Sequence, residues 1–337
     1  MKYSGIDLHS NNCFVVVSDG EDRVVVSKRV KNELPQILAL LAAHREEIAG
    51  VVVESTYNWY WLVDGLQDAG YTVHLANTHA IKKYDGLKHS GDEADARYLA
   101  HLLRLGLLPT GTILPRADRA LRDLARKRMQ LVRSRTQHIL ALQNISARQF
   151  GSKFASNQIK RMTSEHIDAL DLATDIRMAL KANLAIIEAI GVQIALLEAR
   201  LAEALKMEGN YARLKSIPGV GVTLATVITL ETGPISRFAA AGHYASYARC
   251  VGSQYVSNGK KKGEGNRKNG NQYLSWAFVE AAHFALRYSE PAKRYYERKR
   301  AKTNVAVATK ALAHKLARAC FHMLKDGQDF DAGRCFA

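Results

Sequence analysis

The sequence has few cysteines and no long apolar run. Its 337 residues include only four cysteines, whose irregular spacing fits neither a zinc site nor a disulfide framework: Cys13, Cys250, Cys320 and Cys335. Every apolar stretch falls well short of the roughly 20 residues that span a bilayer. The opening segment places Asp7 where a cleavable signal needs apolar residues. We therefore expect a cytoplasmic protein with no membrane partner.

Acidic residues are also scarce. The chain has 32 Asp and Glu against 48 Lys and Arg, which gives a formal net charge of +16. The first 100 residues are acidic, with 10 basic and 14 acidic side chains, so the excess of positive charge lies in the rest of the chain. Such a charge makes a polyanion, and nucleic acid above all, the expected partner. A hydrophobic share of 47% excludes a disordered chain.

The first hundred residues alternate strand and helix patterns. Strands are predicted at 2–10, 13–19, 23–30, 50–56 and 71–76, and helices at 34–47, 61–70 and 89–106. Three antiparallel strands followed by strands that alternate with helices is the order of an RNase H-like mixed sheet, whereas Rossmann folds begin with a βαβ unit. The sequence therefore predicts an α/β domain of the RuvC/RNase H type at 1–112.

The next region, 113–210, is predicted to be a long helical arm. Leu180, Ile187, Ile194 and Leu201 recur every seven residues, as in a coiled coil. Such a stripe must be buried, either against a second copy of the chain or against the preceding helix in an intramolecular hairpin. The interpretation preferred from sequence is self-association through this stripe.

The last region, 211–330, is predicted to be a mainly α-helical domain. Its segment IPGVGVTLA, with Gly219 and Gly221, is similar to the turn of helix-hairpin-helix modules, whose backbone amides bind a DNA phosphate. A plain turn between two helices is the alternative.

Four carboxylates are candidates for chemistry. Asp7 interrupts an apolar strand and Glu54 ends the VVVE strand, and in an RNase H-like sheet the first strand lies beside the fourth. Asp92 and Asp95 continue the apolar face of the helix at 89–106, where unpaired charges are costly. The four acids together predict a cage for two magnesium ions.

The segment 257–271, SNGKKKGEGNRKNGN, is a loop rich in glycine and cations. Its backbone can approach phosphates while its lysines neutralise charge, and Ser257 beside these cations is a candidate nucleophile. The alternative is a loop that binds nucleic acid without chemistry. The residues expected to bind nucleic acid are Arg119, Arg122, Arg126, Lys127, Arg133, Gly219, Gly221, Lys260, Lys261, Lys262, Arg267 and Lys268.

Several motifs, taken in order, resemble one family. The chain resembles the N-terminal domain of DEDD insertion-sequence transposases, relatives of the Piv DNA invertases, at three motifs. These are GIDLHS, then VVVEST, and then DEADA with RYLAHLLRLGLLPTGTILP directly after it. The specific match is the insertion sequence one-hundred-and-ten family. Three further stretches are similar to the C-terminal transposase domain of that family: 216–228, 253–282 and 295–317.

This resemblance implies a site-specific recombinase that excises and inserts its own element, guided by a bridge RNA encoded in that element. It implies a RuvC-like site at Asp7, Glu54, Asp92 and Asp95 that uses Mg²⁺ or Mn²⁺ on donor and target DNA. It also implies a serine nucleophile, and homodimers that pair into homotetramers.

The family's serine loop often ends Ser-Ser-Gly-Gly-Lys, where this chain reads GSQYVSNGK. Ser257 keeps its place before Asn258, Gly259 and Lys260 and is the first choice, with Ser253 as the alternative. Two rival functions are a metal-dependent nuclease of the Holliday-junction resolvase type, with no covalent serine step, and a basic nucleic-acid-binding scaffold without enzymatic activity.

Overall fold

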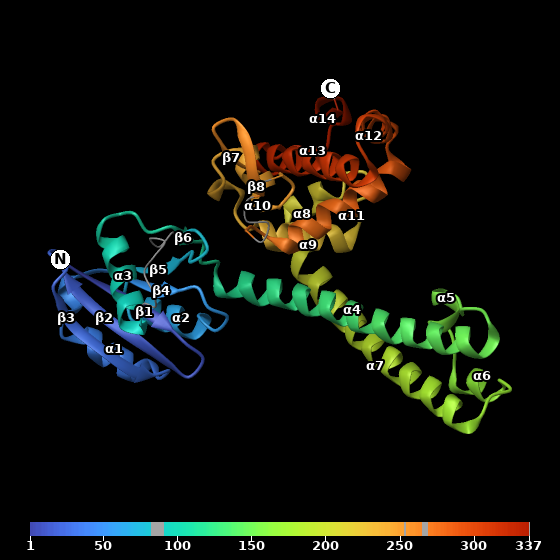
Figure 1. Ribbon diagram of the computed structural model, residues 1–337, viewed down its shortest axis with the longest axis horizontal. Helices are drawn as coiled ribbons and strands as arrows, with labels where there is room; N and C mark the ends of the chain where they lie inside the picture. Colours follow the sequence, from blue (N-terminus) through green and yellow to red (C-terminus); the bar gives the residue numbers. More distant parts are fainter. Residues whose placement is uncertain (82–90, 253, 265–268, 337) are drawn as a thin grey trace. The chain divides into compact units, whose positions relative to one another are not determined.

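The computed structural model describes residues 1–81, 91–252, 254–264 and 269–336 (Figure 1). The chain divides into two compact units, Met1–Leu114 and Pro115–Ala337. The helical arm and the C-terminal helical region, which the sequence analysis treats as separate domains, both fall in the second unit.

The first unit is built on a six-stranded mixed sheet in the order β3-β2-β1-β4-β5-β6. Its elements are β1 (Lys2–Leu8), β2 (Asn12–Asp19), β3 (Val24–Lys31), α1 (Leu34–Ala42), η1 (Arg45–Glu47), β4 (Ile48–Glu54), α2 (Tyr60–Asp68), β5 (Val73–Ala76), α3 (Asp92–Arg104) and β6 (Thr110–Gly111). Strand β1 pairs antiparallel with β2 and parallel with β4. The expected adjacency of the first and fourth strands is therefore confirmed, and the mixed sheet is compatible with a RuvC-like fold. The short strand β6, which pairs with β5, was not anticipated.

The two faces of this sheet bury different helices. Ile37 and Leu41 of α1 and Leu62 and Leu66 of α2 pack with the strands in one apolar cluster. The opposite face carries α3, whose Leu99 packs with residues of β4 and β5. A sheet with helices on both faces covers its central strands from both sides, which explains the runs of consecutive buried residues in β1, β2 and β4.

The second unit begins with a helical hairpin. Its elements are α4 (Arg116–Phe150), α5 (Ser156–Ile159), α6 (Ser164–Asp168) and α7 (Thr174–Leu205). Helices α4 and α7 lie side by side along the arm (Figure 1). Leu180, Leu184 and Ile187 of α7 pack with Ile139 and Leu142 of α4.

The preferred sequence interpretation of the seven-residue stripe is therefore wrong. Leu180, Ile187, Ile194 and Leu201 are all buried, and they pack within the chain. The intramolecular hairpin is the observed arrangement, because the preceding helix is long enough to cover the stripe.

Helix α7 is also the one helix in the described ranges that is long and apolar enough to cross a bilayer. Its most apolar 18-residue window has a mean hydropathy of 1.7. By length and composition, this helix therefore departs from the expectation that every apolar stretch is too short to span a bilayer. A single helix of this kind is weak evidence for membrane insertion, since core helices pass the same test. In this structure one face of α7 is covered by α4.

The rest of the second unit is a compact helical module. Its elements are α8 (Gly209–Leu214), α9 (Val222–Thr232), η2 (Ile235–Arg237), α10 (Ala241–Tyr247), β7 (Gln254–Ser257), β8 (Lys260–Glu264), α11 (Gln272–Tyr288), α12 (Glu290–Lys302), α13 (Val305–Asp326) and α14 (Ala332–Phe336). Tyr244 and Phe278 are fully buried in its core. Part of the segment expected to be a Gly- and Lys-rich loop is instead the β7–β8 hairpin.

Candidate active site

The acidic site forms on the face of the sheet that α3 covers. Gly5 of β1 lies so close to α3 that a Cβ atom there would be 1.9 Å from the Ala96 carbonyl oxygen. Because side chains alternate along a strand, Asp7 points to the same face as Gly5. On β4, Val52 packs with Leu99 of α3, so Glu54 follows on that face as well. Glycine at position 5 thus allows α3 to approach the two strand-end acids.

Strand register brings Asp7 and Glu54 side by side. The parallel pairing of β1 with β4 aligns Ile6 with Val53, so the next residue of each strand is one of these acids. Asp7 is 4% exposed, whereas Glu54 is half-buried. The sequence analysis expected the two carboxylates to be neighbours from the strand order alone, and this register agrees with that expectation.

The first turns of α3 supply the other two acids. Asp92 and Asp95 are half-buried, and the buried residues Ala96, Leu99 and Ala100 continue the helix toward the sheet. Acids are favoured in a first helical turn, where backbone N–H groups carry partial positive charge. Arg29 of β3 donates a hydrogen bond to Asp92 Oδ2 and so ties α3 to the edge of the sheet.

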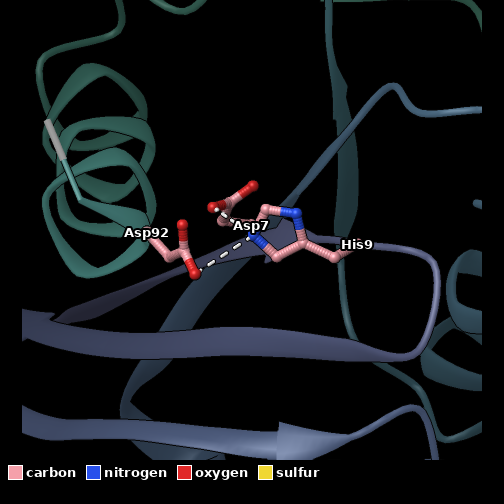
Figure 2. A group of neighbouring side chains, drawn as sticks. All are labelled: Asp7, His9 and Asp92. Atoms are coloured by element: carbon pink, nitrogen blue, oxygen red, sulfur yellow. Dashed lines mark ion pairs between the residues drawn. The ribbon is translucent and has the colours of Figure 1, made fainter. Parts of the chain in front are cut away.

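His9 joins this group, although the sequence analysis gave no histidine a role at the metal site. Its Nε2 lies 3.2 Å from Asp7 Oδ2 and 3.3 Å from Asp92 Oδ2 (Figure 2). One ligand atom from each of the three residues lies within 4.8 Å of the others. The signal that could have identified His9 is its position two residues after Asp7, at the carboxyl end of the same strand.

Two asparagines hold the backbone of His9. The Nδ2 groups of Asn32 and Asn58 each donate a hydrogen bond of 3.0 Å to the His9 carbonyl oxygen. Asn32 follows β3 and Asn58 follows β4, so loops from both sides of β1 fix the start of the turn. These two hydrogen bonds hold the backbone of His9 and do not use its ring nitrogens.

The donor set fits a divalent cation. His9 Nε2 is buried and has no hydrogen-bond partner among the described residues, although two carboxylate oxygens lie beside it. A cation between these atoms would be bound by both carboxylates and the imidazole nitrogen. Oxygen ligands suit Mg²⁺ and Mn²⁺, and an added imidazole suits Mn²⁺ better than Mg²⁺. Glu54 and Asp95 share this face but are not part of the three-residue cluster.

Cys13 of the neighbouring strand β2 packs in the apolar cluster on the opposite face of the sheet and offers no thiolate to the site. It pairs with Leu8 across β1 and β2. Burial, and next the charge of Asp7, raise the pKa of the Cys13 thiol to about 11. The thiol therefore stays protonated near neutral pH, and the site remains one of oxygen and nitrogen ligands.

The basic residues predicted on α4 fall into two groups. Arg119 is 3% exposed and Arg122 is half-buried. Arg126, Lys127 and Arg133 line an open hollow of about 360 Å³, which also includes Asp123, Gln130 and Tyr273. The second group therefore lines an open part of the surface.

Within the hollow, Arg126 is fixed by a buried carboxylate. Its Nε and Nη2 donate to the two oxygens of Glu231 at 2.6 and 2.8 Å, and its guanidinium lies 4.6 Å from the Tyr273 ring centre. Burial alone would lower the pKa of Arg126, but the hydrogen bonds to Glu231 raise it. Asn271, which caps α11, donates a third hydrogen bond to Glu231 at 2.7 Å. This ion pair links α4, α9 and the start of α11.

The two glycines of the expected DNA-binding turn differ in their surroundings. Gly219 has φ +88°, and a Cβ atom there would be 2.6 Å from Phe284 Cβ, so packing against α11 requires glycine. Gly221 caps the N-terminus of α9 and has open space around its Cα atom. Only Gly221 therefore leaves room for a phosphate at its own Cα.

Ser257 ends β7 and is exposed, and the neighbouring Lys260, Lys261 and Lys262 are exposed on β8. Ser253, Arg267 and Lys268, which were also singled out from the sequence, lie outside the described residues. The four acids belong to the first unit and Ser257 belongs to the second.

The strand order and the acids at its carboxyl edge define a protein compatible with the RuvC-like class of nucleic-acid enzymes. Two family profiles match the chain: one for DEDD transposases of the IS110 type at residues 4–147, and one described as "Transposase IS116/IS110/IS902 family" at 211–297. The chain belongs to the IS110 family of DEDD transposases. That family suggests use of a divalent metal, in agreement with the cluster at Asp7, His9 and Asp92.

A relative in Streptomyces coelicolor is named "Insertion element IS110 uncharacterized 43.6 kDa protein". It is 30% identical over 187 residues, which cover 53% of this chain and 46% of the relative. The match therefore spans less than half of the relative's length.

Proposed function

We propose that this chain is an RNA-guided DNA recombinase that excises and inserts a mobile element. The observation that carries the proposal is the cluster of Asp7, His9 and Asp92 on an RNase H-like sheet in a chain of the DEDD transposase family. The positive charge of the chain outside its first 100 residues supports a nucleic-acid substrate.

In this proposal, the metal site comprises Asp7, Glu54, Asp92 and Asp95, with His9 as an added ligand. A bound Mg²⁺ or Mn²⁺ supplies Lewis-acid polarisation of a phosphate oxygen. The protein's own contribution is positional: the β1–β4 register holds Asp7 beside Glu54, and Gly5 brings α3 close enough for Asp92 to reach His9.

The nucleophile in this proposal is Ser257. Its Oγ forms a bond to a DNA phosphorus as the bond from that phosphorus to the departing sugar oxygen breaks. The serine proton passes to water, and the departing oxygen takes a proton from water. The phosphoserine conserves the energy of the phosphodiester bond for rejoining, which suits a recombinase and is unnecessary for a nuclease.

The nucleic-acid surface follows from the exposed cations. Five exposed cations are expected to contact phosphates: Lys127 and Arg133 of the α4 hollow, and Lys260, Lys261 and Lys262 of the hairpin. Within the same proposal, Arg126 lines the hollow, and Arg122, Gly221, Arg267 and Lys268 complete the set drawn from the sequence. Arg119, which is 3% exposed, and Gly219, which packs against α11, are left out of this surface.

The expected partners are a bridge RNA from the element, donor DNA and target DNA, in a homodimer that pairs into a homotetramer. The support for RNA and for this assembly is the family resemblance. Sequencing the nucleic acid that cross-links to the purified protein tests the expected RNA, and light scattering of the complex tests the expected homotetramer. Random host RNA and a monomeric complex would contradict them.

Denaturing gels decide between recombinase and nuclease. Wild type, Ser257→Ala and Ser253→Ala are incubated with RNA transcribed from the element's noncoding end and with labelled DNA that carries the joined element ends. We expect a protein–DNA adduct in wild type and Ser253→Ala and none in Ser257→Ala. An adduct lost only in Ser253→Ala would transfer the role to that residue. Cleavage that requires metal but forms no adduct with any protein would favour the resolvase-like nuclease.

A further inference from the structure

The β7–β8 hairpin has a tight two-residue turn. Asn258 and Gly259 have φ values of +49° and +70°, the positive values that a type I′ turn requires at both central positions. Asn-Gly is the favoured sequence for this turn because both residues adopt positive φ at low cost. The turn matches the twist of the flanking strands and sets their register.

That register places Ser257 directly opposite Lys260. Residues that face each other across an antiparallel pair project from the same face of the ribbon, with Cβ atoms roughly 4.5–5.5 Å apart. Both side chains are exposed. A phosphate that contacts the Ser257 hydroxyl therefore lies within reach of the flexible side chain of Lys260.

The two following lysines occupy different positions. Lys261 pairs with Val256 and, by the alternation of strand side chains, projects from the opposite face of the hairpin. Lys262 falls at the register shift next to Tyr255 and Val256, where β8 has one residue more than β7. Of the three lysines, Lys260 is the one that the pairing sets beside the serine.

We propose that Lys260 is a catalytic residue that binds the phosphate attacked by Ser257. The inference rests on the proposed function, since it concerns the phosphodiester of that reaction. The ammonium group pairs with non-bridging phosphate oxygens, whose negative charge it stabilises as the Oγ–P bond forms and the bond to the sugar oxygen breaks. Lysine suits this position because it is a compact point charge on a flexible stem. The serine proton still passes to water.

The test measures the rate of adduct formation at saturating DNA. The full-length protein is used with the element-derived RNA and the joined-end DNA duplex, and Lys260→Met is compared with Lys261→Met. Loss of a preorganised charge that stabilises a transition state costs roughly 10²–10³-fold in rate. We expect a loss of that size for Lys260→Met, and a smaller loss for Lys261→Met, whose main effect is on DNA affinity.

The Lys260→Arg variant distinguishes a role of Lys260 as a positive charge from a role in proton transfer. A guanidinium keeps the positive charge but does not release its proton, so we expect this variant to recover most of the rate that Lys260→Met loses. An arginine variant as slow as the methionine variant would overturn the role as a cation. Equal losses in Lys260→Met and Lys261→Met would overturn the positional argument.

A second variant tests the pairing itself. Gly259→Val strains the turn and disturbs the alignment of Ser257 with Lys260, although both side chains remain. We expect slower adduct formation, and in the double variant with Lys260→Met little further loss, because the two changes remove the same interaction. Fully multiplicative losses would contradict the proposal. Absence of any adduct in wild type would instead refute the proposed function.

Discussion

The two candidate sites hold their reactive groups in opposite ways. In the first unit, Asp7 is buried on a central strand, and α3 reaches it through the backbone approach that Gly5 permits. In the second unit, Ser257 is exposed at the end of a two-stranded hairpin with a two-residue turn. The carboxylate site is positioned by the core of its unit, whereas the serine is positioned by local turn geometry.

This difference suits the chemistry of each site. Carboxylates that share a cation repel one another without it, so they need a framework that resists separation. A nucleophile that must reach a phosphate inside a nucleic-acid complex benefits from exposure. We therefore expect changes in the packing around the first site, as at Gly5, to affect metal binding and folding together, and changes at the hairpin to affect reaction rates with the fold intact.

The largest effect is expected from Asp7→Asn. The substitution removes one of the two carboxylates beside His9, so we expect recombination to fall by roughly 10³-fold and Mn²⁺ binding to be lost. The fold should persist, because asparagine has nearly the same size. Calorimetric titration with MnCl₂ and circular dichroism check both points. Glu46→Gln, an exposed acid of η1, is the matched control. Native recombination in Asp7→Asn would disprove the site.

The arm offers the next comparison, between buried and exposed apolar residues of one helix. Ile187 is 5% exposed against α4, whereas Val192 is 59% exposed. We expect Ile187→Ala to destabilise the arm by about 3 kcal/mol, since it leaves a cavity between α4 and α7. Val192→Ala should leave stability nearly unchanged. Hydrogen exchange of the α7 amides measures the difference. Equal protection in the two variants would show that α4 does not cover this stripe in solution.

Glycine-to-alanine changes compare the two sites directly. In Gly5→Ala the new Cβ would meet the Ala96 carbonyl, so α3 has to move, at a cost of about 2 kcal/mol and with loss of the contact between Asp92 and His9. Gly259 has φ +70° and open space around it, so Gly259→Ala strains only the turn, by roughly 1–2 kcal/mol.

Thermal denaturation and MnCl₂ titration distinguish these outcomes. We expect Gly5→Ala to lower the melting temperature and weaken Mn²⁺ binding, and Gly259→Ala to change neither. A Gly5→Ala protein that melts and binds Mn²⁺ like wild type would contradict the proposed approach of α3. A lower melting temperature in Gly259→Ala would show that the hairpin contributes to the global fold.

Sequence patterns predicted the framework of the first unit well. The strand patterns at 2–10, 13–19, 23–30 and 50–56 were sufficient to order β1, β2, β3 and β4, and this order places Asp7 beside Glu54. His9 was missed because a single histidine after a strand has many roles, and only the approach of α3 sets it between two carboxylates. Its pairing with Asp92 depends on a contact between residues 83 positions apart, which periodicity does not encode.

In the second unit, residue composition and repeats predicted some features incorrectly, because local turn geometry and long-range contacts determine them. The lysines and glycines of 257–271 suggested a loop, although the dipeptide at 258–259 is a strong hairpin signal. The seven-residue stripe of α7 was recognised from the sequence. Such a repeat predicts that the stripe is buried, but it does not predict whether the covering helix belongs to the same chain or to a second copy. Likewise, the charge pattern of α4 did not reveal that Arg126 is paired with Glu231, which is 105 residues away.

The smallest effect is expected from Asp22→Asn, at the turn between β2 and β3. Asp22 Oδ2 lies 2.6 Å from both His101 Nδ1 and Arg104 Nη2, so the turn is tied to the last turns of α3. Burial would raise the pKa of Asp22, but the hydrogen bonds from Arg104 and His101 lower it below the ordinary 3.8. The stabilisation is therefore present above that ordinary value and is lost as pH falls through the lower folded-state pKa.

We expect Asp22→Asn to cost about 1 kcal/mol at pH 7, the upper range for a partly exposed ion pair. Asparagine tolerates the φ of +62° at this position, so the backbone should be retained, whereas Asp22→Ala adds strain and should cost more. Urea unfolding of wild type and Asp22→Asn at pH 7, 5 and 3 measures the difference, which should persist at pH 5 and shrink at pH 3. In 1 M NaCl the difference at pH 7 should also fall, because salt screens partly exposed charges. A difference that is independent of pH and salt would mean that the Asp22 side chain stabilises the turn through packing. The C-terminal end of α3 would then not depend on charge, in contrast to the carboxylate site at its N-terminal end.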